Sequence, residues 1–126
     1  MPMVRQEFKC KELVDLCRKL GKRPRFPVYM SGELMNAPLE ELELSVRSYN
    51  CLRRAGMFTI GDVVKGIDGR NDLLRIRHLG MRSADEIMEA IMEYQYLILP
   101  EKMKKRYLAR VAELNRREER LTSEGE

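Results

Sequence analysis

The chain has 126 residues, of which 35% are charged and 44% are hydrophobic, and its formal net charge is +4. This length suits one globular unit with appendages. The first residues are polar, and no apolar run approaches the about 20 residues that a membrane span needs, so we expect a cytoplasmic protein without a signal peptide.

The residue types argue against an enzyme and against a metal or disulfide framework. The three cysteines, Cys10, Cys17 and Cys51, lack the CxxC spacing of zinc ligands, and His78 is the one histidine. The sequence contains no Gly-rich phosphate loop, and no pair of carboxylates stands out from ordinary helix-surface glutamates. We therefore expect no catalytic site, no metal and no cofactor.

Residues 6–20 are predicted to form an amphipathic helix that ends at Gly21. Its apolar face consists of Cys10, Leu13, Val14, Cys17 and Leu20. The stretch 22–32, which holds two prolines and a glycine, is predicted to be an extended connector. Its basic run at 22–25 fits a solvated linker better than a DNA-tracking arm.

Residues 46–55 are predicted to form a helix with Ser45 as its N-cap and Gly56 as its left-handed end. One face of this helix is polar and consists of Arg47, Asn50, Cys51 and Arg54. A second, mostly apolar face is predicted to point inward and consists of Val46, Tyr49, Leu52 and Ala55. The polar face is either solvated, as most charged helix faces are, or a binding surface.

A short helix is predicted to follow, capped by Thr59 and turning Ile60, Val63 and Val64 inward. A turn at 66–70 precedes a further turn of helix that begins at 71–74. No stretch of the sequence has the alternation of a strand. The sequence therefore predicts an all-α fold.

The next predicted helix is long and ends near Leu99, before a proline. Ser83 and Glu86 have the spacing of a capping box at its start. With Gly80 and Arg82 beside it, this helix N-terminus could hold a phosphate. A capping box and a turn glycine also have purely structural roles.

A last helix is predicted at roughly 101–120, with an apolar stripe of Met103, Tyr107, Val111 and Leu114 among many basic residues. This stripe needs a partner. The N-terminal helix, a second copy of the protein and another protein are all consistent with the pattern, so self-association through the terminal helices is one alternative. Residues 122–126 are expected to be disordered.

Four runs in the central region, at 42–56, 59–64, 72–77 and 78–83, carry a resemblance to a known family. In this order and spacing they resemble the C-terminal domain of the bacterial RNA polymerase alpha subunit, over roughly residues 38–95. The resemblance implies a compact bundle of short helices with a helix-hairpin-helix-like unit. It also implies binding to the minor groove of A·T-rich promoter DNA, contacts with transcription factors and no catalysis.

Matching positions carry the family's DNA-binding residues over to this sequence. The resemblance implies that Arg47 enters the minor groove, with Asn50 and Cys51 beside it; the helix face adds Arg54. Contacts to the sugar-phosphate backbone would fall to Gly80, Arg82 and Ser83, and Glu86 belongs to the same surface. Family members usually have Asn in place of His78 and Lys in place of Met81, so this sequence has one fewer side chain that could reach a phosphate.

These observations predict four segments: a helix and connector at 1–37, a DNA-binding module at 38–99, a basic helix at 100–121 and a tail at 122–126. Residues 26–99 hold 8 basic and 11 acidic residues, so binding would depend on the local arginine face rather than on net charge. We expect a nucleoid-associated DNA-binding protein acting in bacterial transcription. The alternative is a protein-interaction module that contacts RNA polymerase, sigma factor or an activator through exposed acidic residues such as Asp62 and Glu89. The sequence lacks the assembly region of a complete alpha subunit and is either a free-standing protein or a fragment.

Overall fold

The structure, a computed structural model, describes residues 10–20, 26–29, 31–66 and 73–124. Its helices are α1 (Lys11–Leu20), α2 (Gly32–Asn36), the 3-10 turn η1 (Leu39–Leu42), α3 (Val46–Arg54), α4 (Ile60–Gly66), α6 (Met81–Ile98) and α7 (Glu101–Glu124). The one β-type pairing among these residues is an isolated bridge between Pro38 and Thr59, so the predicted all-α fold is confirmed. None of the described helices combines the length and the apolar character needed to cross a membrane.

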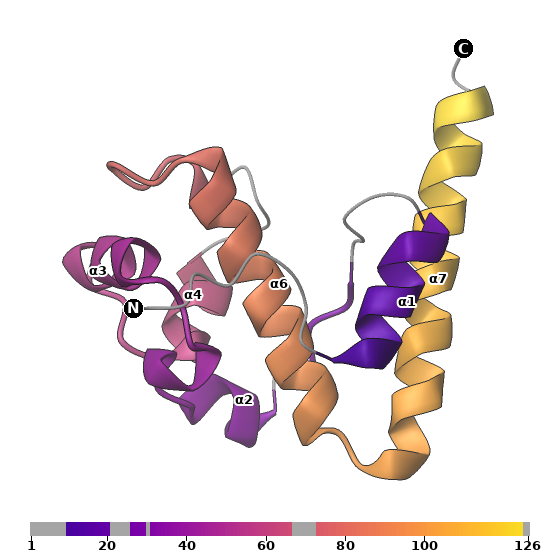
Figure 1. Cartoon of the computed structure of the whole chain (residues 1–126), viewed down its shortest axis with the longest axis horizontal. Coiled ribbons are helices and arrows are strands. Elements are labelled where there is room, and N and C mark those ends of the chain that lie inside the picture. The colour runs from indigo at the N-terminus through magenta and orange to yellow at the C-terminus, as the bar shows by residue number, and fades with distance from the viewer. Residues whose placement is uncertain (1–9, 21–25, 30, 67–72, 125–126) are drawn as a thin grey trace.

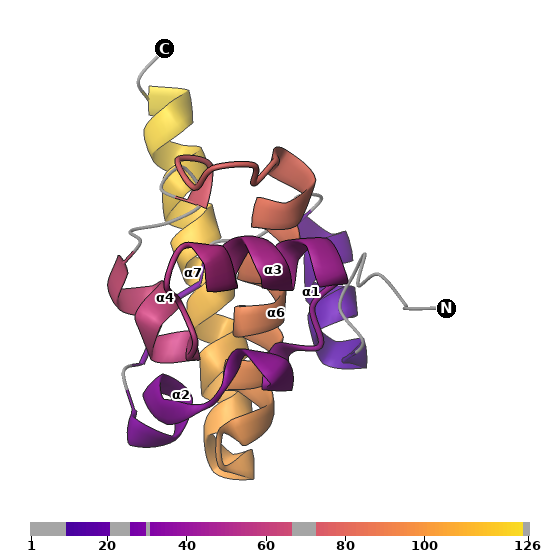
Figure 2. The same ribbon diagram turned by 90° about the vertical axis from the view of Figure 1, so that its left-hand side faces the viewer.

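The long helix α6 lies at the centre of the molecule. Figure 1 shows α2, α3 and α4 on one side of α6 and α1 and α7 on the other. In the perpendicular view of Figure 2, α3 crosses in front of α6 and α7 lies behind it. Each side of α6 therefore has its own hydrophobic core.

The first core lies between α6 and the short helices that precede it. Its fully buried aliphatic side chains include Leu34, Leu39, Leu52, Ile60, Leu73 and Ile87. Helix α4 packs closely on α2, because a Cβ atom built on Gly61 would come within 2.3 Å of the Met35 carbonyl oxygen. Only glycine fits at position 61 without movement of the backbone.

The structure differs from the prediction at the start of this core. Residues 22–32 were predicted to be an extended connector, and the described residues 26–29 form no helix. However, α2 begins at Gly32, and the Ser31 hydroxyl accepts a hydrogen bond from the Leu34 N–H at 3.2 Å. Leu34 and Ala37 are buried in the first core, so this core includes residues before position 38. A five-residue helix is too short to show a helical period in the sequence.

The second core joins the two terminal helices to the C-terminal half of α6. Leu13 of α1, Met92 and Tyr96 of α6, and Tyr107 and Val111 of α7 are buried together. Two of the four residues of the stripe predicted for the last helix, Tyr107 and Val111, thus pack with the N-terminal helix, which was one of the three alternatives, and α6 completes the contact. Met103 and Leu114 are half-buried and do not belong to this core.

A buried amide fixes the connector against this second core. The Gln95 side chain donates hydrogen bonds to the Pro27 carbonyl at 2.7 Å and to the Tyr107 hydroxyl at 3.0 Å. It also accepts one from the Tyr29 N–H at 2.7 Å. Because every polar atom of this buried amide has a partner, its burial carries no large penalty.

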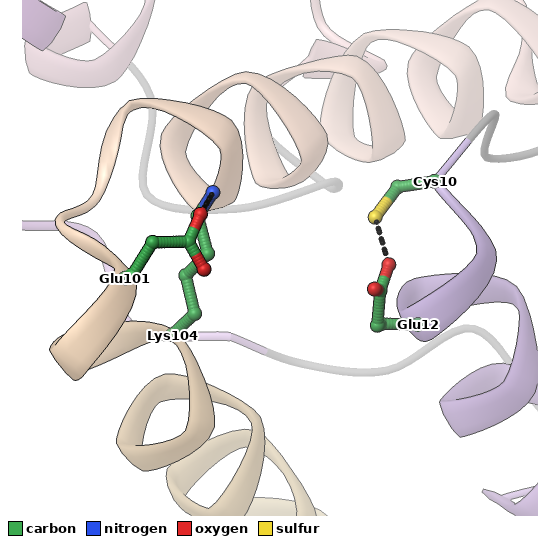
Figure 3. Close-up of polar contacts among 4 residues, drawn as sticks. All are labelled: Cys10, Glu12, Glu101 and Lys104. Atoms are coloured by element: carbon green, nitrogen blue, oxygen red, sulfur yellow. Dashed lines mark hydrogen bonds and ion pairs between the residues drawn. The ribbon is translucent and has the colours of Figure 1, made fainter.

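Helices α1 and α7 begin near one another, as Figure 3 shows. The Cys10 thiol donates a hydrogen bond to the Glu12 carboxylate at 2.9 Å, and the Cys10 N–H donates one to Glu93 at 2.7 Å. Burial, followed by the hydrogen bond to Glu12, raises the pKa of the Cys10 thiol. In α7, Lys104 pairs with Glu101 at 2.9 Å.

The ends of the chain differ in part from the prediction. Helix α7 continues through Glu124, so residues 122–124 are helical where disorder was expected. The predictions for residues 6–9, 21–25, 30, 67–72 and 125–126 lie outside the described residues.

Candidate nucleic-acid interface

Helix α3 has the ends that the sequence predicts. Ser45 is its N-cap, and the Ser45 hydroxyl accepts a hydrogen bond from the Ser48 N–H at 3.3 Å. Gly56 follows the helix with φ of +85°, a left-handed conformation that strains any residue with a Cβ atom. These two residues set the length of the helix that carries Arg47.

The inward face of α3 is not the one that was predicted. Its buried residues are Ser48, Cys51 and Leu52, whereas Val46 is 60% exposed. The predicted inward set is therefore correct for Leu52 and for the half-buried Tyr49, and wrong for the exposed Val46 and Ala55. The helix is rotated because its polar residue Ser48 has a partner inside the protein.

That partner is Glu86 of α6, which is 5% exposed. Its carboxylate accepts hydrogen bonds from the Ser45 N–H at 2.8 Å, from the Ser45 hydroxyl at 2.8 Å and from the Ser48 hydroxyl. Hydrogen bonds to a charged acceptor are stronger than neutral ones. The Glu86 carboxylate thus fastens the first turn of α3 to the first turns of α6.

The capping box predicted at Ser83 and Glu86 is wrong. Helix α6 begins at Met81 with Gly80 as an N-cap that makes no side-chain hydrogen bond, and Ser83 lies inside the helix and is buried. The Glu86 carboxylate is directed to α3 instead of to its own N-terminus. A sequence pattern cannot separate these two uses of the same glutamate.

A reciprocal cap does form at the start of α4. The Thr59 hydroxyl accepts from the Asp62 N–H at 3.1 Å, and the Asp62 carboxylate accepts from the Thr59 N–H at 3.1 Å and from the Phe58 N–H at 2.9 Å. These backbone N–H groups, that of Phe58 first, lower the pKa of Asp62. The predicted cap at Thr59 is confirmed.

Cys51 links α3 to the turn that precedes α6. It is 4% exposed, and its thiol donates a hydrogen bond to the His78 carbonyl at 3.6 Å. His78 has φ of +69°, and histidine is one of the residues that occupy this region more often than most. The structure therefore places Cys51 beneath the surface and not on the exposed face with Arg47.

The remaining predicted site residues lie on the surface of the module. They are Arg47, Asn50 and Arg54 on α3, and Gly80 and Arg82 at the start of α6, all exposed. Arg47 directly precedes Ser48 in the sequence, and Arg82 lies one turn before Glu86 on α6. The hydrogen bonds of Glu86 thus bring the two arginine-bearing helix ends together.

The backbone around Gly80 is open to a ligand. A Cβ atom built on Gly80 meets nothing within 4 Å, and its φ of −87° is one that any residue adopts. Neither packing nor conformation therefore requires a glycine at this position. The neighbouring Met81 is 60% exposed, so an apolar side chain lies in the first turn of α6.

Sequence reasoning did not anticipate an aromatic cluster on the far face of α3. The Arg53 guanidinium lies 4.5 Å from the ring centre of Phe58 and 5.6 Å from that of Tyr49. The Tyr49 hydroxyl donates to the Glu40 carboxylate at 2.9 Å, which raises the pKa of Tyr49. The four-residue spacing of Tyr49 and Arg53 was the available signal.

The two acidic residues suggested as protein contacts have different surroundings. Asp62 is exposed but holds the start of α4. Glu89 was expected to be exposed and is 8% exposed, so that expectation is wrong. Among the residues that the structure describes, no group of three or more His, Cys, Asp and Glu side chains is placed to hold a metal ion.

Comparison with known proteins finds relatives for the central region of this chain. The family model for the C-terminal domain of the bacterial RNA polymerase alpha chain matches residues 30–93. The DNA-directed RNA polymerase subunit alpha of Bifidobacterium adolescentis is 42% identical over 87 residues, which are 64% of this chain and 26% of that protein. The subunit of the same name from Rubrobacter xylanophilus is 49% identical over 61 residues, 48% of this chain and 19% of that protein.

The match thus covers about a quarter of these relatives or less, and no solved structure matched. Helices α1 and α7 lie outside the region that the family matches. The family that matches is a non-catalytic domain of RNA polymerase, and the match implies a role in bacterial transcription. Because that region is half of the protein and contains α2, η1, α3, α4 and most of α6, the protein belongs to the family of C-terminal domains of the bacterial RNA polymerase alpha subunit.

Proposed function

We propose that this protein binds the minor groove of A·T-rich promoter DNA through Arg47, with Asn50 and Arg54 on the same helix. The observation that carries the proposal is the exposure of Arg47 in the first turn of α3, next to the hydrogen bonds that join α3 to α6. A narrow A·T groove has an enhanced negative potential that attracts an inserted arginine. Membership of this family also supports the proposal of minor-groove binding.

Arg82 and the N-terminus of α6 have a separate role in this proposal. An exposed arginine and the free backbone N–H groups of a helix start suit a phosphate of the same duplex. Phosphate contacts position a protein on DNA without reading its sequence. Cys51 and Glu86 hold this surface in shape from beneath, because both are buried and bonded within the protein.

The two arginines are expected to respond differently to truncation. Arg47→Ala should weaken binding to an A-tract duplex about tenfold or more and remove the preference over a G·C duplex, since a groove contact is worth about 1–3 kcal/mol. Arg82→Ala should weaken both duplexes alike and lower the slope of log K against log salt by about 0.9. Fluorescence anisotropy with both duplexes at several salt concentrations measures these changes.

Arg18→Ala is the matched control, because Arg18 is an exposed arginine on α1, away from the module. It should bind DNA as the parent does. All three variants should melt as the parent does, since each removes an exposed side chain. An Arg47→Ala variant that retains the A·T preference with unchanged melting would show that the groove contact lies elsewhere.

A second candidate function is contact with RNA polymerase, sigma factor or a transcription activator. One observation favours it: Phe58 is 48% exposed and stacks with Arg53. Exposed aromatic and arginine side chains are the types most enriched in protein interfaces. This cluster takes the place of the DNA contact as the main function if Arg47→Ala leaves DNA binding intact.

A further inference from the structure

One face of α7 carries four exposed basic side chains. They are Lys102, Lys105, Arg106 and Arg110, and we refer to them as the α7 basic face. Across 101–116 the helix also has two acidic residues. Each is paired with a cation that is not one of these four: Glu101 with Lys104 at 2.9 Å (Figure 3) and Glu113 with Arg116 at 3.5 Å. Among the described residues, no ion pair includes a member of the α7 basic face.

The spacing of these cations suits a row of phosphates. Lys102, Arg106 and Arg110 follow one another at intervals of four residues, so they lie along one side of the helix over about 12 Å. Duplex DNA carries one negative charge for about every 1.7 Å of its axis. A duplex beside α7 would therefore present several phosphates within reach of this face.

The α7 basic face is directed away from the surface proposed to bind the minor groove, which consists of Arg47, Asn50 and Arg54 on α3. Tyr107 and Val111 of α7 are buried against Met92 and Tyr96 of α6, so the exposed cations lie on the side of α7 that is turned away from α6. Helix α3 lies on the opposite side of α6, to the left in Figure 1 and in front in Figure 2. A duplex held by Arg47 does not lie along α7.

We propose that the α7 basic face is a second, sequence-independent binding surface for duplex DNA, so that one copy of the protein bridges two duplexes. This inference rests on the proposed function for the first of the two surfaces. The second surface lies beyond the family match, which ends at residue 93. Phosphate neutralisation by lysine and arginine accounts for most affinity that is independent of sequence, and these cations have no acidic partner to compete with it among the described residues.

A capture experiment tests bridging directly. Beads carry an A-tract duplex, and a fluorescent G·C duplex in solution reports capture in the presence of the protein. Light scattering under the same conditions should give the 14.8 kDa mass of a single chain, so that capture is not due to a dimer. The parent should retain the fluorescent duplex, and retention at the level of beads without protein would overturn the proposal.

The decisive variant replaces all four cations, as Lys102→Gln, Lys105→Gln, Arg106→Gln and Arg110→Gln. Because these side chains are exposed, its melting should match that of the parent. It should bind the A-tract duplex with its A·T preference but capture no second duplex. Its salt slope on the G·C duplex should fall by about 0.9 for each phosphate that the variant no longer neutralises. Lys11→Gln with Arg18→Gln on α1 is the control and should bridge as the parent does.

The outcomes separate this proposal from the proposed function. If the quadruple variant captures the second duplex with an unchanged salt slope, the α7 basic face does not bind DNA, and an acidic protein becomes the partner to seek. If Arg47→Ala keeps the A·T preference, the proposed function fails, while the salt slope of the quadruple variant still reports on α7. If the proposed function and the second binding surface are both correct, the Arg47→Ala variant should bind DNA weakly through α7 and should no longer bridge two duplexes.

Discussion

Glu86 connects the two helix ends that carry Arg47 and Arg82. Its carboxylate accepts from the Ser45 N–H, the Ser45 hydroxyl and the Ser48 hydroxyl, and these donors lie 38 to 41 residues away in the sequence. A buried charge is tolerated only where such donors compensate its desolvation. Glu86 therefore adds a polar link between α3 and α6 to the apolar contacts of the first core.

Glu86→Gln is expected to lower the free energy of unfolding by about 1.5–3 kcal/mol, the range for a hydrogen bond to a charged group. The amide nitrogen cannot accept from the Ser45 N–H, and the remaining oxygen is uncharged. Urea unfolding followed by circular dichroism measures the change. Glu33→Gln on α2 is the control, because Glu33 is exposed, and it should stay within about 0.5 kcal/mol of the parent. Equal stability of the two variants would contradict the role of Glu86.

For single residues, the sequence predicted which side chains are exposed better than it predicted which hydrogen-bond partners they have. Arg47, Asn50, Arg54 and Arg82 are exposed as expected, because charged helix positions away from the core seldom have another place. Ser48 was missed as a buried residue, since nothing in the local pattern distinguishes a serine that bonds to a distant carboxylate from one that faces water. Whether the exposed residues bind DNA stays a prediction.

The terminal helices are held by the second core, in which Leu13 of α1 has no exposed surface. Leu13→Ala is expected to lower the free energy of unfolding by about 2–4 kcal/mol, through lost burial and a cavity beside Tyr96 and Tyr107. Leu97→Ala is the matched control, because Leu97 is 54% exposed, and it should cost far less. Urea unfolding compares the two, and equal costs would show that α1 contributes no core.

Helices that are long enough to show a helical period, or that begin with a local cap, were predictable from the sequence. The shortest elements were not. The ends of α3 and α4 and the apolar stripe of α7 follow from local caps and periodicity. Helix α2 and η1 span five and four residues and depend on contacts from elsewhere, such as the hydrogen bond from the Ile60 N–H to the Ala37 carbonyl at 2.8 Å. These two elements form because of tertiary contacts, which the local sequence does not reveal.

The two cores of the molecule share α6. Ile87 and Ile91 belong to the first core, Met92 and Tyr96 belong to the second, and Phe26 packs against both. Loss of either core would leave half of this helix with its apolar side chains in water. The cost of that exposure, about 25 cal/mol for each Å² of apolar surface, couples α1 and α7 to the short helices of the first core.

We therefore expect the described helices to unfold as one cooperative unit. Calorimetric and van't Hoff enthalpies should agree, and Leu13→Ala, a change in the second core, should lower the amide-exchange protection of α3 and α7 alike. Leu52→Ala makes the reverse test, because Leu52 is buried in the first core and lies far from α7 in the sequence. It too should lower protection in both helices. If Leu13→Ala lowers protection in α7 but leaves α3 unchanged, the appended helices open independently, and α6 does not transmit stability between the two cores.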